Sequence, residues 1–292
     1  MRFAKGHGTE NDFVILLDPD GSGGLTADLT ARLCDRRAGI GADGVLRAVR
    51  TTANGMAGRT DGGPGPAGGA GRPEWFMDYR NADGGVAEMC GNGIRVFARY
   101  LVRHGLAEGP EFTVATRSGP RLVRMRADGG VTVDMGTVAV LGAGSAVIAG
   151  QSYPGLRVSV GNPHLACLVD GPLAPLDLSR PPGLDPGQFP EGGNVELVRV
   201  TGPASVAMRV HERGSGETRS CGTGAVAAAA AAAAANGGDG TWDVRVLGGD
   251  LNVTLDGGRA WLTGPAVIVA EGELDPVWLA AGSPATADAP AR

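Results

Sequence analysis

One short motif occurs twice in this sequence, once in each half of the 292 residues. Cys90 opens CGNGIRVFARYLVRHG, and Cys221 opens CGTGAVAAAAAAAAANGG, so each cysteine stands directly before a predicted helix that ends at glycine. An extended segment with an acidic residue precedes both copies. A motif that appears once per half predicts two domains of one design that face each other.

Short runs with strand character surround these two helices. Most runs are bounded by Gly, Asp, Asn or Pro at hairpin-like spacing, which favours antiparallel sheets over alternating strand-helix units. The predicted class is therefore α+β. A further helix is expected at roughly Leu29–Arg36. The predicted strands include Phe13–Leu17, Phe112–Ala115, Val131–Met135, Leu156–Val160, Val195–Val200, Val206–Val210, Trp242–Val246, Leu251–Leu255 and Val267–Ala270.

Three stretches of low complexity have different expected roles. The run Ala227–Ala235 has the highest intrinsic helix propensity, and side chains this small suit a central helix enclosed by a curved sheet. Residues 51–73 are almost all small, Gly or Pro and bury little apolar surface, so they predict a flexible loop. Residues 280–292 predict a disordered tail.

Charge and cysteine content exclude several classes of protein. A net charge of −5 gives no field that gathers nucleic acid or anionic lipid. No segment is apolar enough for a membrane span, and the first residues do not resemble a secretion signal, so we expect a cytoplasmic protein. The four cysteines form no CxxC pair, which argues against a disulfide framework or a zinc site. We expect Cys34 and Cys167 to be small buried hydrophobes.

The chemistry of Cys90 and Cys221 follows from their place before a helix. A helix N-terminus offers unpaired N–H groups and a partial positive charge, which favour a thiolate and a ligand carboxylate, so the pKa of both thiols is expected to fall. Two such helix starts facing each other could hold one carboxylate and place one sulfur on each face of an α-carbon. One thiolate and one thiol would then invert that carbon, without a metal or other cofactor.

The sequence resembles the diaminopimelate epimerase family over nearly its whole length. The matching stretches are HGTENDF, AGIGADG, RNADG followed by MCGNG, GNPH, GGNVE, HERGSGETRSCGTG and GGDLNV. The resemblance implies interconversion of LL- and meso-2,6-diaminopimelate for lysine and peptidoglycan precursors, no cofactor, and commonly a homodimer. It also implies two similar domains, each a mainly antiparallel sheet or barrel around a central helix, spanning 1–134 with 265–279 returning to it, and 135–264.

The resemblance also assigns roles to residues around the two cysteines. Cys90 and Cys221 are the acid/base pair, assisted by His164 and Glu212. Arg213 can grip a distal carboxylate in a fork, and Glu212 can face an ammonium group. The substrate-binding set is Asn11, Asn81, Gly91, Asn92, Asn162, Asn194, Glu212, Arg213, Gly222 and Thr223. Without the resemblance, the isolated asparagines would be turn residues and the Glu212-Arg213 pair a solvated one.

Two positions depart from the family pattern. Many members carry glutamine where this chain has Gly44, so a substrate contact by that side chain is absent. Glu10 replaces a more frequent glycine, which adds a carboxylate beside Asn11 and requires backbone angles that suit a non-glycine residue.

Three other functions compete with this interpretation. A proline or hydroxyproline racemase also uses two cysteines at helix starts, but its cyclic substrates need no partner such as Arg213. A redox sensor or scaffold would use the two thiols as a switch disulfide. A Cys-His hydrolase would use His164, but nothing in the sequence marks a residue that orients its ring.

Overall fold

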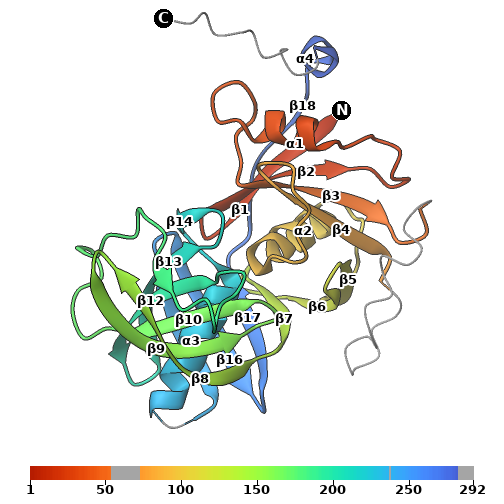
Figure 1. Ribbon diagram of the computed structural model, residues 1–292. Coiled ribbons are helices and arrows are strands. Elements are labelled where there is room, and N and C mark those ends of the chain that lie inside the picture. The colour runs from red at the N-terminus through yellow and green to blue at the C-terminus, as the bar shows by residue number, and fades with distance from the viewer. Residues whose placement is uncertain (54–72, 237, 282–292) are drawn as a thin grey trace, which may run out of the picture.

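The computed structural model describes residues 1–53, 73–236 and 238–281. Two sheet-lined halves lie side by side, each with one long helix in its interior (Figure 1). Most strand pairs are antiparallel, so the predicted α+β class, with mainly antiparallel sheets around central helices, is confirmed. Residues 54–72 of the expected loop and 282–292 of the expected tail lie outside the described residues.

The first half surrounds helix α2 (Gly91–Arg103), whose Phe97 and Leu101 are fully buried. Helix α1 (Ala27–Cys34) lies outside, against β3. Thr26 caps α1 by accepting a hydrogen bond from the Leu29 amide, so the helix begins earlier than predicted. The strands are β1 (Arg2–Gly8), β2 (Asn11–Leu17), β3 (Gly44–Arg50), β4 (Trp75–Asn81), β5 (Glu111–Thr116), β6 (Gly119–Met125) and β7 (Val131–Thr137).

The second half surrounds helix α3 (Gly222–Asn236). The side chains of Ala227–Ala233 are at most 5% exposed, because methyl groups allow β-strands to pack closely on every side of the helix. The strands are β8 (Ala139–Ile148), β9 (Gln151–Ser159), β10 (Pro163–Leu168), β11 (Gly183–Leu184), β12 (Asn194–Gly202), β13 (Ser205–Glu212), β14 (Gly216–Thr218), β15 (Gly240–Val246), β16 (Gly249–Asp256) and β17 (Arg259–Gly264).

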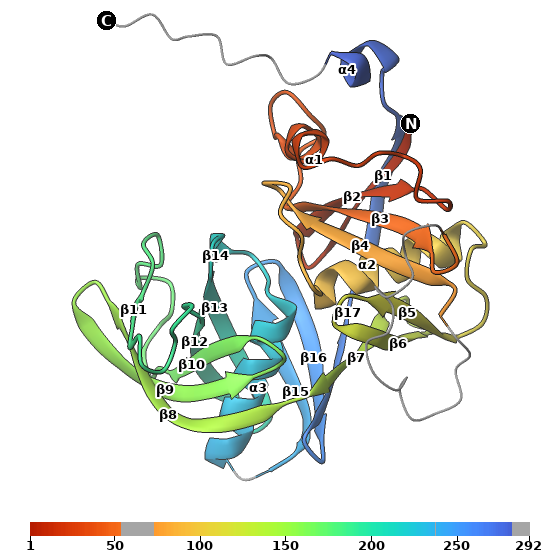
Figure 2. The same cartoon turned by 45° about the vertical axis from the view of Figure 1, so that its right-hand side comes forward.

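After β17 the chain returns to the first half. Strand β18 (Val267–Glu273) pairs antiparallel with β1, and the short helix α4 (Pro276–Ala280) follows it (Figure 2). Trp278 donates from its indole Nε1 to the carbonyl of Ala38, 3.0 Å away. These contacts support our proposed division into 1–134 with 265–279, and 135–264.

The long hairpin β8–β9 is largely missed by the sequence patterns, which predict only Leu156–Val160. Strand β8 is rich in alanine and glycine and mostly exposed, so it lacks the alternation that marks a half-buried strand. No described helix is long and apolar enough to cross a bilayer.

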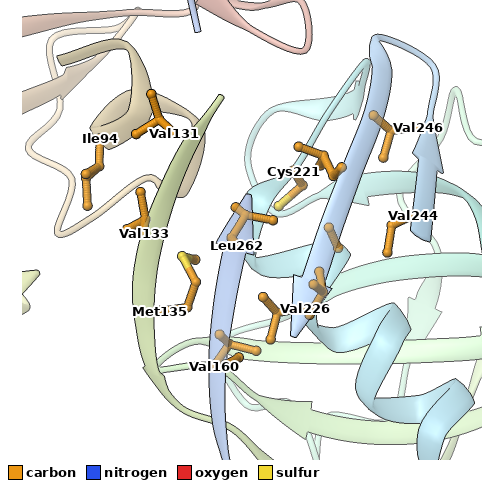
Figure 3. Packing of buried hydrophobic residues seen from close by; sticks show 14 of the residues in the cluster. Ile94, Val131, Val133, Met135, Val160, Cys221, Val226, Val244, Val246 and Leu262 are labelled. Atoms are coloured by element: carbon orange, nitrogen blue, oxygen red, sulfur yellow. The ribbon is translucent and has the colours of Figure 1, made fainter. Parts of the chain in front are cut away.

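Apolar side chains fill the junction between the halves. Strand β17 pairs with β7, and Met135 and Leu262 from these strands lie between the two central helices (Figure 3). A Cβ built on Gly91 would lie 2.9 Å from Met135 Cε and 3.0 Å from a methyl carbon of Leu262. The start of α2 therefore packs directly on Met135 and Leu262, with no room for a side chain at Gly91. This close packing fixes the position of the helix start.

Candidate active site

Each of the two cysteines caps the helix that follows it. Cys90 has extended backbone angles, and its Sγ accepts a hydrogen bond from the Gly93 amide at 3.3 Å. Cys221 Sγ accepts from the Gly224 amide at 3.4 Å. Both sulfurs are thus held at the positive ends of their helices, in the manner of oxygen atoms in ordinary N-caps. Both are free thiols.

The two helix starts meet directly at their glycines. A Cβ built on Gly222 would lie 3.2 Å from Cα of Gly91 and 3.3 Å from the backbone N of Asn92. Only a residue without a side chain allows this approach. The sequence expectation that the two motifs face each other is met by contact between the motifs themselves.

Polar side chains bridge the halves beside this contact. Asn92 Nδ2 donates to the carbonyl and hydroxyl oxygens of Ser220 at 3.1 and 3.2 Å. The hydroxyls of Thr9 and Ser220 are 2.6 Å apart and buried. Asn92 Oδ1 is buried without a hydrogen-bond partner among the described residues. Ser220, which directly precedes Cys221, therefore links the start of α3 to the first half by hydrogen bonds.

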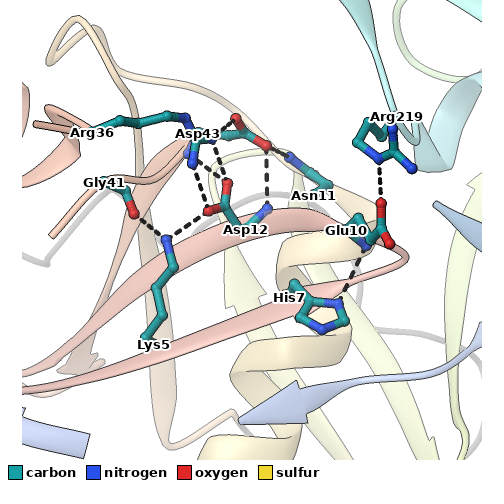
Figure 4. A network of polar contacts seen from close by, with 9 residues as sticks. All are labelled: Lys5, His7, Glu10, Asn11, Asp12, Arg36, Gly41, Asp43 and Arg219. Atoms are coloured by element: carbon teal, nitrogen blue, oxygen red, sulfur yellow. Dashed lines mark hydrogen bonds and ion pairs between the residues drawn. The ribbon is translucent and has the colours of Figure 1, made fainter. Parts of the chain in front are cut away.

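Asn11 lies beside Cys90, and a charged network fixes its amide. Its Nδ2 donates to Asp43 at 2.8 Å, so its Oδ1 faces Cys90 Sγ at 3.6 Å and Asn92 Nδ2 at 3.2 Å. Arg36 and Lys5 hold the carboxylates of Asp12 and Asp43 behind it (Figure 4). Burial opposes ionisation of Asp12, but the hydrogen bonds from Arg36 and Lys5 lower its pKa.

His164 lies in the second half, wholly buried, with a partner on each ring nitrogen. Its Nδ1 is 2.7 Å from Glu196 Oε1, and its Nε2 is 3.0 Å from Asn162 Oδ1 and 3.4 Å from Asn194 Nδ2. Asn162 also reaches Thr223 Oγ1 at 3.5 Å, which connects this cluster to the start of α3. The sequence marked no residue that orients the His164 ring, and the structure supplies Glu196 in that place.

Glu212 and Arg213 follow one another at the end of β13 but have different surroundings. Glu212 accepts from the Thr218 hydroxyl, and its pKa is raised by burial, while hydrogen bonds from Thr218 and Cys221 lower it. The Arg213 amide donates to Asn194 Oδ1 at 2.9 Å, whereas its guanidinium is about half exposed and donates to the carbonyl of Glu191 at 3.1 Å. Glu212 thus faces Cys221, and Arg213 borders solvent.

Asn81 is exposed at the end of β4, and its backbone amide bonds to Gly85. Its side chain forms no hydrogen bond with the other expected site residues among those that the structure describes, so it is not part of the cluster. Gly44 pairs with Asn81 across β3 and β4, and a Cβ at Gly44 would lie 2.5 Å from the carbonyl oxygen of Arg80. Glycine at position 44 therefore allows β4 to lie closer to β3 than a larger residue would.

Glu10 takes left-handed backbone angles, with φ of 62°, which glycine would adopt more readily. Its carboxylate pairs with Arg219 of the second half instead of entering the cysteine site. The added charge at this position therefore joins the two halves on the surface.

The pKa of both thiols is raised, so the expectation of a lowered pKa is wrong for this structure. Burial raises the pKa of Cys90 to about 11, and the hydrogen bond from the Gly93 amide opposes this only in part. Burial and the charge of Glu212 raise the pKa of Cys221 well above its ordinary value. Loss of hydration outweighs the favourable helix ends.

Sequence reasoning missed Thr9, Asp43, Glu196 and Ser220 as parts of this site, together with Arg95, whose Nη2 donates to the Thr9 hydroxyl. A signal existed for Glu196, because a charged residue inside the apolar strand run NVELV, on the same face as Asn194, demands a partner. No local signal marks the other four. No group of three or more described His, Cys, Asp or Glu side chains could hold a metal ion.

Comparison with known proteins places the chain among enzymes. The family described as Diaminopimelate epimerase matches residues 3–141 and 156–269. The Diaminopimelate epimerase of Thermobifida fusca is 60% identical over 274 residues, which cover 94% of this chain and 98% of the relative. That of Mycolicibacterium smegmatis is 52% identical over 288 residues, covering 95% and 98%.

Solved structures share the fold at low sequence identity. A Bacillus anthracis phenazine biosynthesis protein of the PhzF family matches with a TM-score of 0.65 and 16% identity, over 94% of this chain and 98% of that one. A hydroxyproline epimerase from Agrobacterium vitis with bound trans-4-hydroxy-L-proline matches with a TM-score of 0.61 and 16% identity, over 95% and 93%. These likenesses confirm the fold of two sheet-wrapped helices.

Proposed function

This chain belongs to the diaminopimelate epimerase family, and we propose that it interconverts LL- and meso-2,6-diaminopimelate by moving a proton at Cα between Cys90 and Cys221. The observation that carries this assignment of residues is the direct contact of the two cysteine-capped helix starts. Supply of precursors for lysine and peptidoglycan follows from this reaction.

The carboxylate next to the reacting carbon binds at the two helix starts. The amides of Gly91, Asn92, Gly222 and Thr223 belong to the first turns of α2 and α3, where backbone N–H groups have no helical acceptor. Neither first turn contains an acidic residue that would compete with the ligand. These donors also stabilise the negative charge that develops on the carboxylate as Cα loses its proton.

Proton transfer uses one cysteine as thiolate and the other as thiol. The Cα–H bond breaks as an S–H bond forms on one face, and the second S–H bond breaks as a new C–H bond forms on the other. The high pKa of both thiols suits this task, because a thiolate with a high pKa is a stronger base toward a weakly acidic carbon. The two cysteines exchange roles when the direction reverses.

The far end of the substrate meets the polar cluster of the second half. Asn162 and Asn194 orient the polar groups there, and Glu212 faces an ammonium group. The half-exposed Arg213 leaves the Glu191 carbonyl to grip the distal carboxylate in a fork. His164, bonded to Asn162 and Asn194, assists the movement of protons. Asn11 joins the binding set from the first half, beside Cys90. Asn81, which lies outside the cluster, is proposed as a binding residue on the family resemblance alone.

Deuterium uptake at Cα of diaminopimelate in D₂O tests this function. Wild-type protein is expected to exchange the α-proton and convert the LL isomer to the meso isomer, whereas Cys90→Ala and Cys221→Ala abolish the conversion. Cys167→Ala, a cysteine buried in a separate apolar cluster, is the matched control and stays active. Substantial epimerisation by either site variant contradicts the two-base mechanism, and turnover of L-proline without turnover of diaminopimelate contradicts the substrate.

We also propose that the protein is a cytoplasmic homodimer formed along β18. This strand has β1 as its described partner, and its Val267 and Val269 side chains are 41% and 60% exposed. A second copy can cover this apolar edge. Sedimentation of wild type should give twice the monomer mass, and Val269→Lys should give the monomer. A monomeric wild type contradicts the proposal.

A further inference from the structure

Arg95, in the second turn of α2, is the largest fully buried side chain among the described residues. Its Nε donates to the carbonyl of Pro265 and its Nη2 to the hydroxyl of Thr9, both at 3.3 Å. Its Nη1 has no hydrogen-bond partner in the part of the chain that the structure describes. All of these partners are neutral, and no carboxylate in the described ranges forms an ion pair with Arg95.

A guanidinium in this position is energetically unfavourable on its own. Burial lowers the pKa of Arg95 to about 10, so the group still carries its charge at neutral pH. A helical side chain leans toward the N-terminus of its helix, which is the positive end and repels a cation. An unpaired buried charge is strongly destabilising. The fold therefore holds a cation where only a nearby anion can compensate it.

Cys90 is the group at this helix start that can become an anion. A Cβ built on Gly8 would lie 3.0 Å from Arg95 Nη2 and 3.1 Å from the carbonyl oxygen of Asn92, so the guanidinium reaches back to the first turn of α2. At this place its positive charge attracts a Cys90 thiolate. The other groups facing the sulfur are Glu212, which disfavours a thiolate, and the buried phenol of Tyr79, whose own pKa is raised by burial. Cys90 is thus the cysteine with a cation on its own helix.

Cys221 has the opposite surroundings. The charged groups that act on its sulfur are the carboxylates of Glu212 and Glu196, with the neutral Tyr79 also nearby. Glu196 Oε1 would lie only 2.8 Å from a Cβ built on Gly224, whose amide donates to Cys221 Sγ. His164 bonds to the same carboxylate oxygen. Two carboxylates at this helix start favour the neutral thiol.

We propose that Arg95 is a positioning residue that makes Cys90 the more readily ionised thiol of the pair, so that Cys90 is the first to serve as the base while Cys221 keeps its proton and serves as the acid. The assignment deepens the proposed function by giving each cysteine its starting role. Substrate whose α-proton faces Cys90 then reacts without a prior exchange of protons between the sulfurs.

Alkylation by iodoacetamide, followed by mass spectrometry of the cysteine peptides, measures the pH midpoint of each thiol without any substrate. In wild type, the midpoint of Cys90 is expected below that of Cys221. The midpoint is compared instead of the rate, because Cys90 is also the more exposed of the two. A Cys221 midpoint below that of Cys90 overturns the proposal, even if no variant folds.

Variants of Arg95 then test whether its charge causes the lower midpoint of Cys90. Arg95→Met should raise the Cys90 midpoint by about one pH unit or more, which lowers labelling of Cys90 about tenfold at pH 8, whereas Arg95→Lys should keep it near the wild-type value. Arg103→Met removes a cation from the exposed end of the same helix and should move neither midpoint. A folded Arg95→Met protein with an unchanged Cys90 midpoint, or an equal shift in Arg103→Met, overturns the proposal. Deuterium exchange by wild type separately tests the proposed function.

Discussion

Gly222→Ala is the sharpest test of the contact between the two helix starts. The added methyl carbon would lie 3.1 Å from a Leu262 methyl carbon, 3.2 Å from Gly91 Cα and 3.3 Å from Asn92 N. Ordinary contacts between carbon atoms are about 3.5–4.0 Å, so the helix starts must move apart by roughly 0.5 Å.

The expected cost to stability is small. Overpacking costs about 1–3 kcal/mol, and alanine recovers at most about 1 kcal/mol of helix propensity, less at the first helical position. Each kcal/mol shifts the midpoint of a domain of this size by roughly 2–4 °C, so the melting temperature should fall by only a few degrees.

The expected cost to activity is much larger. A misplacement of about 1 Å at a reacting centre can cost roughly a hundredfold in rate. The assay is deuterium uptake at Cα of LL-diaminopimelate, alongside thermal unfolding. Gly171→Ala is the matched control, because a Cβ there meets no atom within 4 Å and its backbone is not left-handed. Gly222→Ala with at least half of wild-type activity would refute the facing arrangement as the basis of catalysis.

Three further predictions follow from the surroundings of the thiols. Because the pKa of Cys90 lies near 11, its thiolate fraction rises with pH, and its alkylation rate should increase about tenfold per unit from pH 7 to 9; a plateau below pH 8 would contradict the raised pKa. Glu196→Gln removes a negative charge that disfavours the Cys221 thiolate, so the pH midpoint for alkylation of Cys221 should fall, and an unchanged midpoint would exclude this interaction. Asp43→Asn frees the Asn11 amide to turn and should lower kcat about tenfold with a smaller change in KM, measured by the same exchange assay, and wild-type kcat would show that the orientation of Asn11 is unimportant.

The sequence by itself determined the elements that depend on neighbouring residues. Helix starts at Gly91 and Gly222 follow from cysteines that cap the next turn and from glycines that leave its N–H groups open. The alanine run predicted a helix that β-strands can enclose, and the family signatures identified the reaction. The nine named strand runs coincide with strands of the structure, whereas other strands, among them β1, β3, β4 and β17, were not named. The small-residue strand β8 escaped because its sequence lacks a two-residue period.

Only the tertiary structure decided the electrostatics of the site. Helix geometry predicted thiols with a lowered pKa, yet burial by both halves raises the pKa, because desolvation depends on everything packed around a group. The contacts of Glu196 with His164 and of Ser220 with Asn92 join residues far apart in the chain. Helix capping depends on residues that are adjacent in the sequence. Hydration and charge pairing depend on which distant segments come into contact, and those contacts give Cys90 and Cys221 their different surroundings.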